Sequence, residues 1–135
     1  MQPRRTKYKK YYKPREFDKT LTNLKTLKPD SSLELLSLEP FYINGKQIES
    51  ARQTIRRKLK KRGILNILIY PNLGVSKKPT SARMGKGKGK TQCWVNRIKT
   101  GTSIFRLNGV TFKEGVTALK AGANKLPLKV KLLRV

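Results

Sequence analysis

The sequence has no histidine and only one cysteine, Cys93, among its 135 residues. A single cysteine cannot close a disulfide within the chain, and without histidine no Cys/His metal cluster can form. General acid–base catalysis and the activation of a nucleophile both lack an imidazole base. Cys93 lies in an alternating apolar and polar run, where we expect it to be a small buried side chain. We therefore predict no metal site, no cofactor and no enzyme activity, and a binding or structural role instead.

Acidic residues are also scarce. Seven Asp and Glu face 33 Lys and Arg, which gives a net charge of +26. Sixteen of these cations fall between Arg52 and Arg106, in a stretch that contains no carboxylate. Such an excess of one sign destabilises a compact monomer by self-repulsion, so we expect a polyanionic partner. Nucleic acid is the first candidate for this partner, and an anionic membrane surface is the second.

Long hydrophobic runs are missing as well. Apolar residues make up 36% of the chain, enough for one modest core. No run approaches the roughly 20 residues that cross a bilayer, and the first residues lack the apolar centre of a signal peptide. We expect one domain with a tail, no membrane contact and no homo-oligomer.

Residues 77–91, which we call the glycine ribbon, combine glycine and positive charge at short spacing. Gly85, Gly87 and Gly89 occupy alternate positions, and glycine lets a backbone approach another surface without a Cβ in the way. The ribbon is predicted to become ordered only against a polyanion, which its amide and ammonium groups can reach together. Its cations are Lys77, Lys78, Arg83, Lys86, Lys88 and Lys90.

Two nucleotide-binding motifs resemble the glycine ribbon but fail on spacing. A Walker loop ending at Gly89-Lys90-Thr91 requires glycine at position 84, where this chain has Met84. That loop must also open a helix, whereas the residues that follow alternate like a strand. The dinucleotide fingerprint Gly-x-Gly-x-x-Gly is replaced by Gly-x-Gly-x-Gly. Neither motif predicts a nucleotide site.

The first nineteen residues form a basic N-terminal arm in which aromatic residues are interleaved. Tyr8, Tyr11, Tyr12 and Phe17 lie among the cations, a pattern that suits phosphate contacts together with stacking on exposed bases. The alternative is a disordered solubilising tail, although such tails are usually poor in aromatic residues. The candidate phosphate contacts of the arm are Arg4, Arg5, Lys7, Lys9 and Lys10.

A helix is predicted to start at Asn44 and to end near Gly63, after a strand with a bulge or break over residues 33–43. Gln47 completes a capping-box pattern with Asn44, and apolar residues recur at helical spacing up to Leu59. Pro40 argues against a central, fully paired strand before this helix. The exposed face of the helix carries more cations than its dipole needs, and we interpret it as a second polyanion contact. The candidates on this face are Arg56, Arg57, Lys60 and Lys61.

The rest of the chain predicts three more strands and one more helix before a last strand. We expect a buried strand over residues 64–70, closed by a turn at 71–74, and a hairpin of strands 92–98 and 104–107. A second helix would bury Phe112, Val116, Leu119 and Ala123, and the last strand would span residues 128–135. Gly115 and Gly122 are expected to weaken that helix by about 1 kcal/mol each. The order β-α-β-β-β-α-β indicates a two-layer α+β domain over residues 33–135, with residues 1–32 as arm and connector.

Several short stretches of the sequence form a recognisable set in collinear order. They are Arg-Met-Gly-Lys-Gly-Lys-Gly at 83–89, Gln-Ile-Glu-Ser-Ala-Arg at 47–52, Pro71, Lys78-Pro79, Trp94-Val95, Ala-Asn-Lys-Leu-Pro at 123–127 and the basic run at 2–8. With these residues the sequence resembles the ribosomal protein sixteen family of the large subunit, in its bacterial and organellar form. The resemblance covers residues 1–12 and 35–132. The family's usual His-Lys-Gly-Arg segment is replaced by Tyr-Lys-Pro-Arg at 12–15, and residues 20–32 have no clear counterpart.

This resemblance implies a hammerhead-type α/β fold that docks on large-subunit rRNA near the central protuberance. It also implies neighbouring ribosomal proteins and a part in shaping the A-site tRNA region near the peptidyl transferase centre. The arm, the helix face and the glycine ribbon, including Met84, would be the contacts, and Arg83 could grip a phosphate or base edge bidentately.

Two other functions remain as rivals, and the compartment is inferred separately. One rival is a non-ribosomal basic protein that compacts nucleic acid; the weaker one is a membrane-active polycation. The Lys-over-Arg bias and the lack of a presequence suit a product made in a mitochondrion, with a plastid or a bacterial cytoplasm as alternatives.

Overall fold

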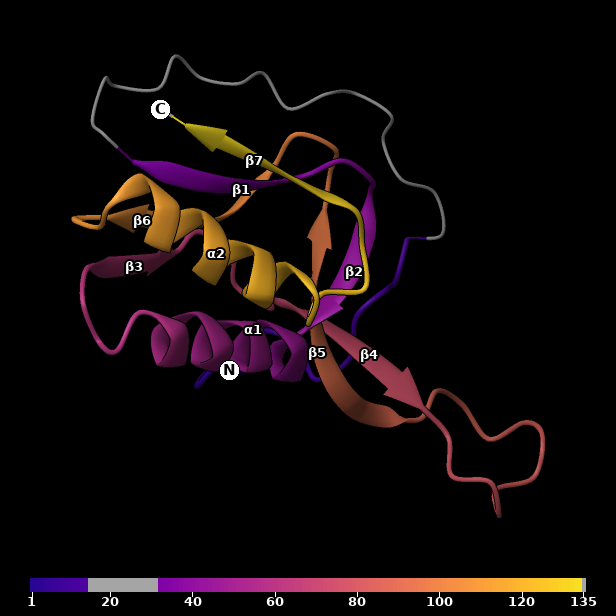
Figure 1. Ribbon diagram of the computed structural model, residues 1–135. Coiled ribbons are helices and arrows are strands. Elements are labelled where there is room, and N and C mark those ends of the chain that lie inside the picture. Colours follow the sequence, from indigo (N-terminus) through magenta and orange to yellow (C-terminus); the bar gives the residue numbers. More distant parts are fainter. Residues whose placement is uncertain (15–31, 135) are drawn as a thin grey trace.

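The structure, a computed structural model, describes residues 1–14 and 32–134 (Figure 1). The predicted connector therefore lies outside the described residues except for Ser32, as does Phe17. The elements in chain order are β1 (Leu33–Ser37), β2 (Phe41–Asn44), α1 (Gly45–Lys58), β3 (Ile64–Ile67), β4 (Leu73–Lys77), β5 (Lys90–Ile98), β6 (Ser103–Asn108), α2 (Phe112–Ala123) and β7 (Val130–Arg134). This mixture of helices and antiparallel strands confirms the predicted α+β class.

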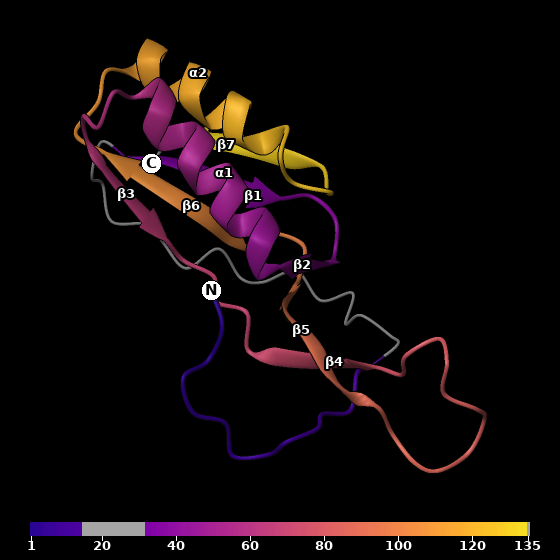
Figure 2. The same ribbon diagram turned by 90° about the horizontal axis from the view of Figure 1, so that it is seen from below.

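A four-stranded antiparallel sheet in the order β3-β6-β1-β7 carries the hydrophobic core. Figure 2 shows α1 and α2 together on one face of this sheet. Leu35, Phe105, Ile55 and Leu119 are all fully buried where the two layers meet. Burial of such large apolar side chains is the main source of stability in a domain of this size.

The prediction that Pro40 excludes a central strand is wrong. β1 pairs with β6 on one side and with β7 on the other, and all five of its residues are buried. Pro40 lies in the break between β1 and β2, so its missing N–H is not required by either ladder. The predicted break is confirmed, since residues 33–43 contain two strands, and these belong to different sheets.

A second antiparallel sheet has the order β2-β5-β4. The predicted hairpin of residues 92–98 with 104–107 is wrong, because β5 and β6 lie in different sheets. β5 is paired on one edge with β2 and on the other with β4, which leaves no edge for β6. The turn at Gly101, which has a φ of +81°, leads from one sheet to the other, and its N–H donates to the Ser37 carbonyl at 2.8 Å.

β4 was not predicted, because Gly74 and the preceding proline were interpreted as a turn. Gly74 is in fact buried and lies opposite Trp94 in the ladder with β5. Residues 64–70 were predicted to be a buried strand, but β3 is shorter and lies at the edge of its sheet, and Ile64 is exposed. Cys93 is half-buried rather than buried.

α1 begins as predicted, with both hydrogen bonds of a capping box. The Asn44 side chain accepts from the backbone N–H of Gln47 and also from that of Lys46, and Gln47 Oε1 accepts from the Asn44 N–H at 2.9 Å. The predicted apolar face is confirmed, since Ile48, Ala51, Ile55 and Leu59 are buried.

α2 has the predicted position, and its predicted face is confirmed in part, because Leu119 is fully buried and Val116 and Ala123 pack partly buried against the core. Phe112 is 53% exposed, and the buried residues of the helix include Gly115 and Gly122. A Cβ at Gly115 would lie 2.4 Å from Leu33 Cδ1, and one at Gly122 would lie 2.4 Å from Ile55 Cγ1. The two glycines therefore let α2 approach β1 and α1 closely, which the sequence-based account of them as weak points missed. Among the helices that the structure describes, none has the length and apolar character to cross a membrane.

Candidate nucleic-acid interface

The glycine ribbon connects β4 to β5 and extends away from both sheets (Figure 1). Its ends are held in the sheet, because Lys77 pairs with Lys90 in the register of the two strands. Beyond that pair, nearly every residue of the ribbon is exposed, and Met84 reaches 99% exposure. The structure thus presents the predicted cations Arg83 and Lys86 to solvent.

The three glycines of the ribbon have two different roles. Gly85 and Gly87 have φ values of +88° and +80°, and a Cβ on either would meet nothing within 4 Å. They bend the backbone in the left-handed conformation, which is unfavourable for most residues other than glycine, and Lys86 at φ +54° lies in the same region. At Gly89 the reason is space, since a Cβ there would lie 2.5 Å from the Lys77 carbonyl oxygen.

The described part of the N-terminal arm, residues 1–14, crosses the molecule from the start of α1 to the base of the glycine ribbon (Figure 2). At its beginning, the Met1 carbonyl oxygen would lie 2.5 Å from a Cβ at Gly45. Near its end, Tyr42 OH donates to the Pro14 carbonyl, and the Lys13 ammonium lies 4.7 Å from the Tyr42 ring centre. The arm therefore contacts the β2-β5-β4 sheet, and its predicted contacts Arg4, Arg5, Lys7, Lys9 and Lys10 are all exposed.

The third predicted group lies at the C-terminal end of α1. Arg57, Lys60 and Lys61 are exposed, while Arg56 is half-buried and its Nη1 donates to the Gly63 carbonyl at 2.9 Å. Lys60 and Lys61 have φ values of +48° and +67°, so the chain turns sharply and both ammonium groups emerge from the turn. Four cations at a helix C-terminus are favoured by its dipole and leave this end strongly positive.

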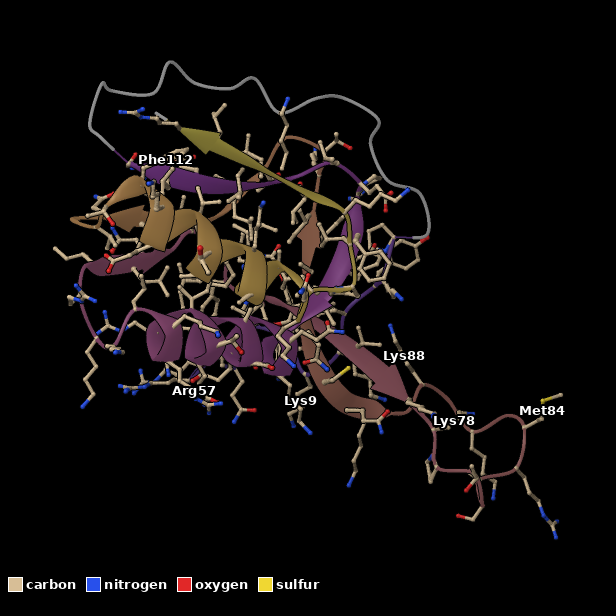
Figure 3. The ribbon with its side chains drawn as sticks, viewed as in Figure 1. Lys9, Arg57, Lys78, Met84, Lys88 and Phe112 are labelled. Carbon is tan, nitrogen blue, oxygen red and sulfur yellow. The ribbon has the colours of Figure 1, made fainter. Side chains whose placement is uncertain are left out.

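The structure brings two of the three predicted groups into contact and leaves the third apart. The arm contacts the glycine ribbon through hydrogen bonds in which Lys10 Nζ donates to the Lys88 carbonyl and Lys88 Nζ donates to the Tyr11 carbonyl. In the view of Figure 3, Lys9 lies between Arg57 on α1 and Lys78 at the base of the ribbon, and Met84 marks the ribbon's far end. Among the described residues, no hydrogen bond joins the helix-end group to the arm or to the ribbon.

The carboxylates of the described residues form ion pairs with cations outside the three predicted groups. Glu34, Glu39, Glu49 and Glu114 are each ion-paired, and none of their partners is a predicted contact. These partners are Arg106 at 2.5 Å, Lys129 at 3.2 Å, Arg52 at 2.6 Å and Arg62 at 3.0 Å. The predicted cations are therefore not neutralised by any carboxylate that the structure describes, which leaves their charge for a partner.

The pair of Glu49 and Arg52 on α1 has shifted pKa values. Hydrogen bonds from the Arg52 guanidinium lower the pKa of Glu49 below its usual value, and the same bonds raise the pKa of Arg52. The two residues lie three positions apart on one helix face. No three His, Cys, Asp or Glu side chains gather into a possible metal site in the part of the chain that the structure describes.

Three residues that hold the arm in place were not recognised from the sequence. Tyr11 was interpreted as a ring for stacking on bases, but it packs edge-on against Trp94 with ring centres 5.4 Å apart. Thr91 Oγ1 donates to the Lys9 carbonyl at 3.0 Å. No local pattern joins these positions, because they are far apart in the sequence. Tyr8 and Tyr12 remain exposed, as base stacking requires.

Comparison with known proteins gives a consistent family assignment. A family model described as Ribosomal protein L16p/L10e matches residues 3–133. The chain is similar to the large ribosomal subunit protein uL16 of Acidiphilium cryptum (strain JF-5), with 42% identity over 135 residues, 98% of this chain and 95% of that protein. It is also 38% identical over 136 residues to the large ribosomal subunit protein uL16 of Chelativorans sp. (strain BNC1), covering 99% of this chain and 96% of that protein.

Proposed function

The chain belongs to the Ribosomal protein L16p/L10e family, and on this basis we propose that it is a structural constituent of the large ribosomal subunit. Two relatives that bear the name of a large-subunit protein match it over nearly their whole length, which supports the same role here. Its partners would be large-subunit rRNA and neighbouring ribosomal proteins. Its contribution is binding and positioning, without a catalytic step of its own.

One observation supports rRNA as the partner: a long exposed ribbon of glycine and lysine that extends from the ends of β4 and β5 beyond both sheets and carries no carboxylate. Folded RNA offers closely spaced phosphates, and each contacted phosphate releases counterions and so favours binding. Ammonium groups and the exposed backbone of Gly85 and Gly87 can approach the same phosphates.

We propose the same three groups as contacts that the sequence predicts. Positions on the arm and the helix end would bind phosphates and orient the protein on rRNA, because phosphate contacts position a protein without reading sequence. The ribbon would reach furthest, and Arg83 would grip a phosphate or base edge with its planar guanidinium. The proposed contacts are Arg4, Arg5, Lys7, Lys9, Lys10, Arg56, Arg57, Lys60, Lys61, Lys77, Lys78, Arg83, Met84, Gly85, Lys86, Gly87, Lys88, Gly89 and Lys90.

The finer part of the proposal concerns the tip of the glycine ribbon. We place it near the A-site tRNA and the approach to the peptidyl transferase centre, as the family resemblance implies. Residues 33–135 would form a hammerhead-type rRNA-binding domain, with residues 1–32 as its arm and connector. The two relatives named above are bacterial, which supports a bacterial-type ribosome in a bacterial cytoplasm; the mitochondrial location stays a prediction.

Sedimentation tests the proposal most simply. Tagged full-length protein, expressed in its own host, should sediment with large-subunit particles and stay bound after a wash at moderate salt. Protein that remains at the top of the gradient while other large-subunit proteins sediment would contradict the assignment.

A competition experiment separates this function from its nucleic-acid-compacting rival. At fixed salt, structured large-subunit rRNA should displace bound duplex DNA at a lower concentration than the reverse. Equal competition by both nucleic acids would favour the compacting protein.

A further inference from the structure

The N-terminal arm and the glycine ribbon are joined by reciprocal hydrogen bonds. Lys10 Nζ donates to the Lys88 carbonyl at 2.5 Å, and Lys88 Nζ donates to the Tyr11 carbonyl. Thr91 Oγ1 adds a third bond, to the Lys9 carbonyl at 3.0 Å. Each lysine thus directs its ammonium group to a backbone carbonyl of the other segment, and the carbonyl dipole partly offsets the positive charge that it receives.

A packing site on the β2-β5-β4 sheet, formed by Trp94 and Gly74 and called the seat below, holds the arm at this point. The Tyr11 ring packs against Trp94 at an interplanar angle of 72°, an edge-to-face arrangement that aromatic pairs favour. Gly74, opposite Trp94 in the ladder, leaves the room for it, since a Cβ there would lie 2.9 Å from Tyr11 Cδ2. Tyr11 is half-buried as a result, whereas its neighbour Tyr12 is 79% exposed.

These bonds act where the glycine ribbon has little other support. The pairing of β4 with β5 ends at Lys77 and Lys90, and Gly89 is the next residue outward along the ribbon. Further out, Gly85 and Gly87 have open space around them, and one bond from Lys78 Nζ to the Gly85 carbonyl crosses the ribbon. Like charges along the ribbon repel one another. Contacts at the base of the ribbon therefore limit the range of conformations that it samples.

We propose that the arm is a positioning element for the glycine ribbon. Tyr11 anchors it in the seat formed by Trp94 and Gly74, and Lys10 and Lys88 then fix the base of the ribbon before RNA is met. Lys88 is accordingly a positioning residue in addition to its proposed contact with rRNA, and Lys86, which has no bond to the arm among the described residues, is a contact residue alone. The effect on RNA affinity rests on the proposed function, whereas the effect on the order of the ribbon does not.

Backbone order parameters from NMR relaxation of the full-length free protein test the positioning directly. In the wild type, the amide of Gly89 should have an order parameter near that of the strands, about 0.8, and Tyr11→Ala should lower it below about 0.6. Lys88→Met should do the same. The matched controls, Tyr12→Ala and Lys86→Met, remove a ring and a charge of the same kind and should leave Gly89 unchanged.

The outcomes separate positioning from charge. If the order parameter of the Gly89 amide were unchanged in both Tyr11→Ala and Lys88→Met, the proposal would be overturned. An equal decrease of this order parameter in the two controls would overturn it as well. If Tyr11→Ala lost the chemical-shift dispersion of β1 and β6, the comparison of Lys88→Met with Lys86→Met would decide alone, because both side chains are on the exposed ribbon.

A titration with purified bacterial large-subunit rRNA at fixed salt adds the functional consequence. Lys88→Met and Lys86→Met each remove one cation, so a charge effect alone would weaken binding equally. Positioning predicts an additional loss of about threefold to tenfold for Lys88→Met, because a looser ribbon must be ordered on binding. Equal losses would contradict the functional part. Failure of the wild type to bind would contradict the proposed function, and the order parameters would still decide on positioning.

Discussion

Glycine has different roles in the two sheet regions of this protein. In the four-stranded sheet and its helices, Gly115 and Gly122 lie where a Cβ would come within 2.4 Å of another side chain. In the glycine ribbon of the other sheet, Gly85 and Gly87 have nothing within 4 Å of that position. Glycine permits close packing in one region and backbone bending in open solvent in the other. Under the proposed function, stability would reside in the first region and RNA binding in the second, so that each could be changed alone.

The largest effect should come from the covered sheet. Phe105→Ala removes a ring that is fully buried on β6, and such changes lower the free energy of unfolding by about 3–5 kcal/mol. Denaturant titration followed by circular dichroism measures this loss. RNA affinity at low temperature, with the variant still folded, should be unchanged; a parallel loss of affinity would show that the two regions are not separate.

Charge reversal in the glycine ribbon should have the opposite result. Arg83→Glu together with Lys86→Glu is expected to weaken rRNA binding by about a hundredfold and to reduce the salt slope by about 2, because two phosphate contacts become repulsive. Unfolding should shift by less than about 0.5 kcal/mol, since both side chains are exposed. The titration is done at several salt concentrations, with Lys113→Glu on α2 as a matched exposed control. An unchanged slope would count against the ribbon as a contact.

A pair of glycine substitutions sharpens the comparison. Gly122→Val adds atoms against Ile55, which is fully buried, and should lower the free energy of unfolding by about 1–3 kcal/mol. Gly85→Ala should change it by less than about 0.5 kcal/mol, because the exposed ribbon can relax its φ without losing contacts. Thermal unfolding of both variants measures the difference, and equal losses would contradict the division into regions.

The smallest effect concerns the pair of Glu49 and Arg52. The pKa of Glu49 is lowered in the folded chain by hydrogen bonds from Arg52, so the pair stabilises the fold above the ordinary carboxyl pKa and stops doing so as pH falls through the lowered value. Because the pair is partly exposed, Glu49→Gln should cost less than about 0.5 kcal/mol at pH 7. The difference in melting temperature between the two proteins should vanish as the pH falls below the lowered pKa of Glu49; a difference that grows as the pH falls would contradict this sign.

The sequence predicted local features of the fold well and non-local ones poorly. The start and buried face of α1 were correct because its capping box and helical periodicity lie within one short stretch. The partner of β5 was wrong because alternation shows that a strand exists and not which edge it pairs with. β4 was overlooked because Gly74, a packing position, has the appearance of a turn residue.

The candidate interface shows the same limit. Charge pattern alone identified the exposed cations of the ribbon, such as Arg83 and Lys86, because a long stretch without carboxylates is visible in one dimension. The bonds of Lys88 and Lys10 to the opposite backbone depend on the arm reaching Trp94, and no nearby residue encodes that meeting. Division of the cations into positioning and contact groups therefore needed the structure.

Site-specific photocrosslinking in assembled large subunits tests the central claim most directly. A benzophenone side chain placed at Met84, the exposed end of the glycine ribbon, should crosslink to large-subunit rRNA or to A-site tRNA in high yield. The same group at Leu38, which is also exposed but lies between β1 and β2, should give much less RNA adduct. Crosslinking at position 38 with none at position 84 would contradict the account, because the ribbon would then not be the part of the molecule that meets RNA.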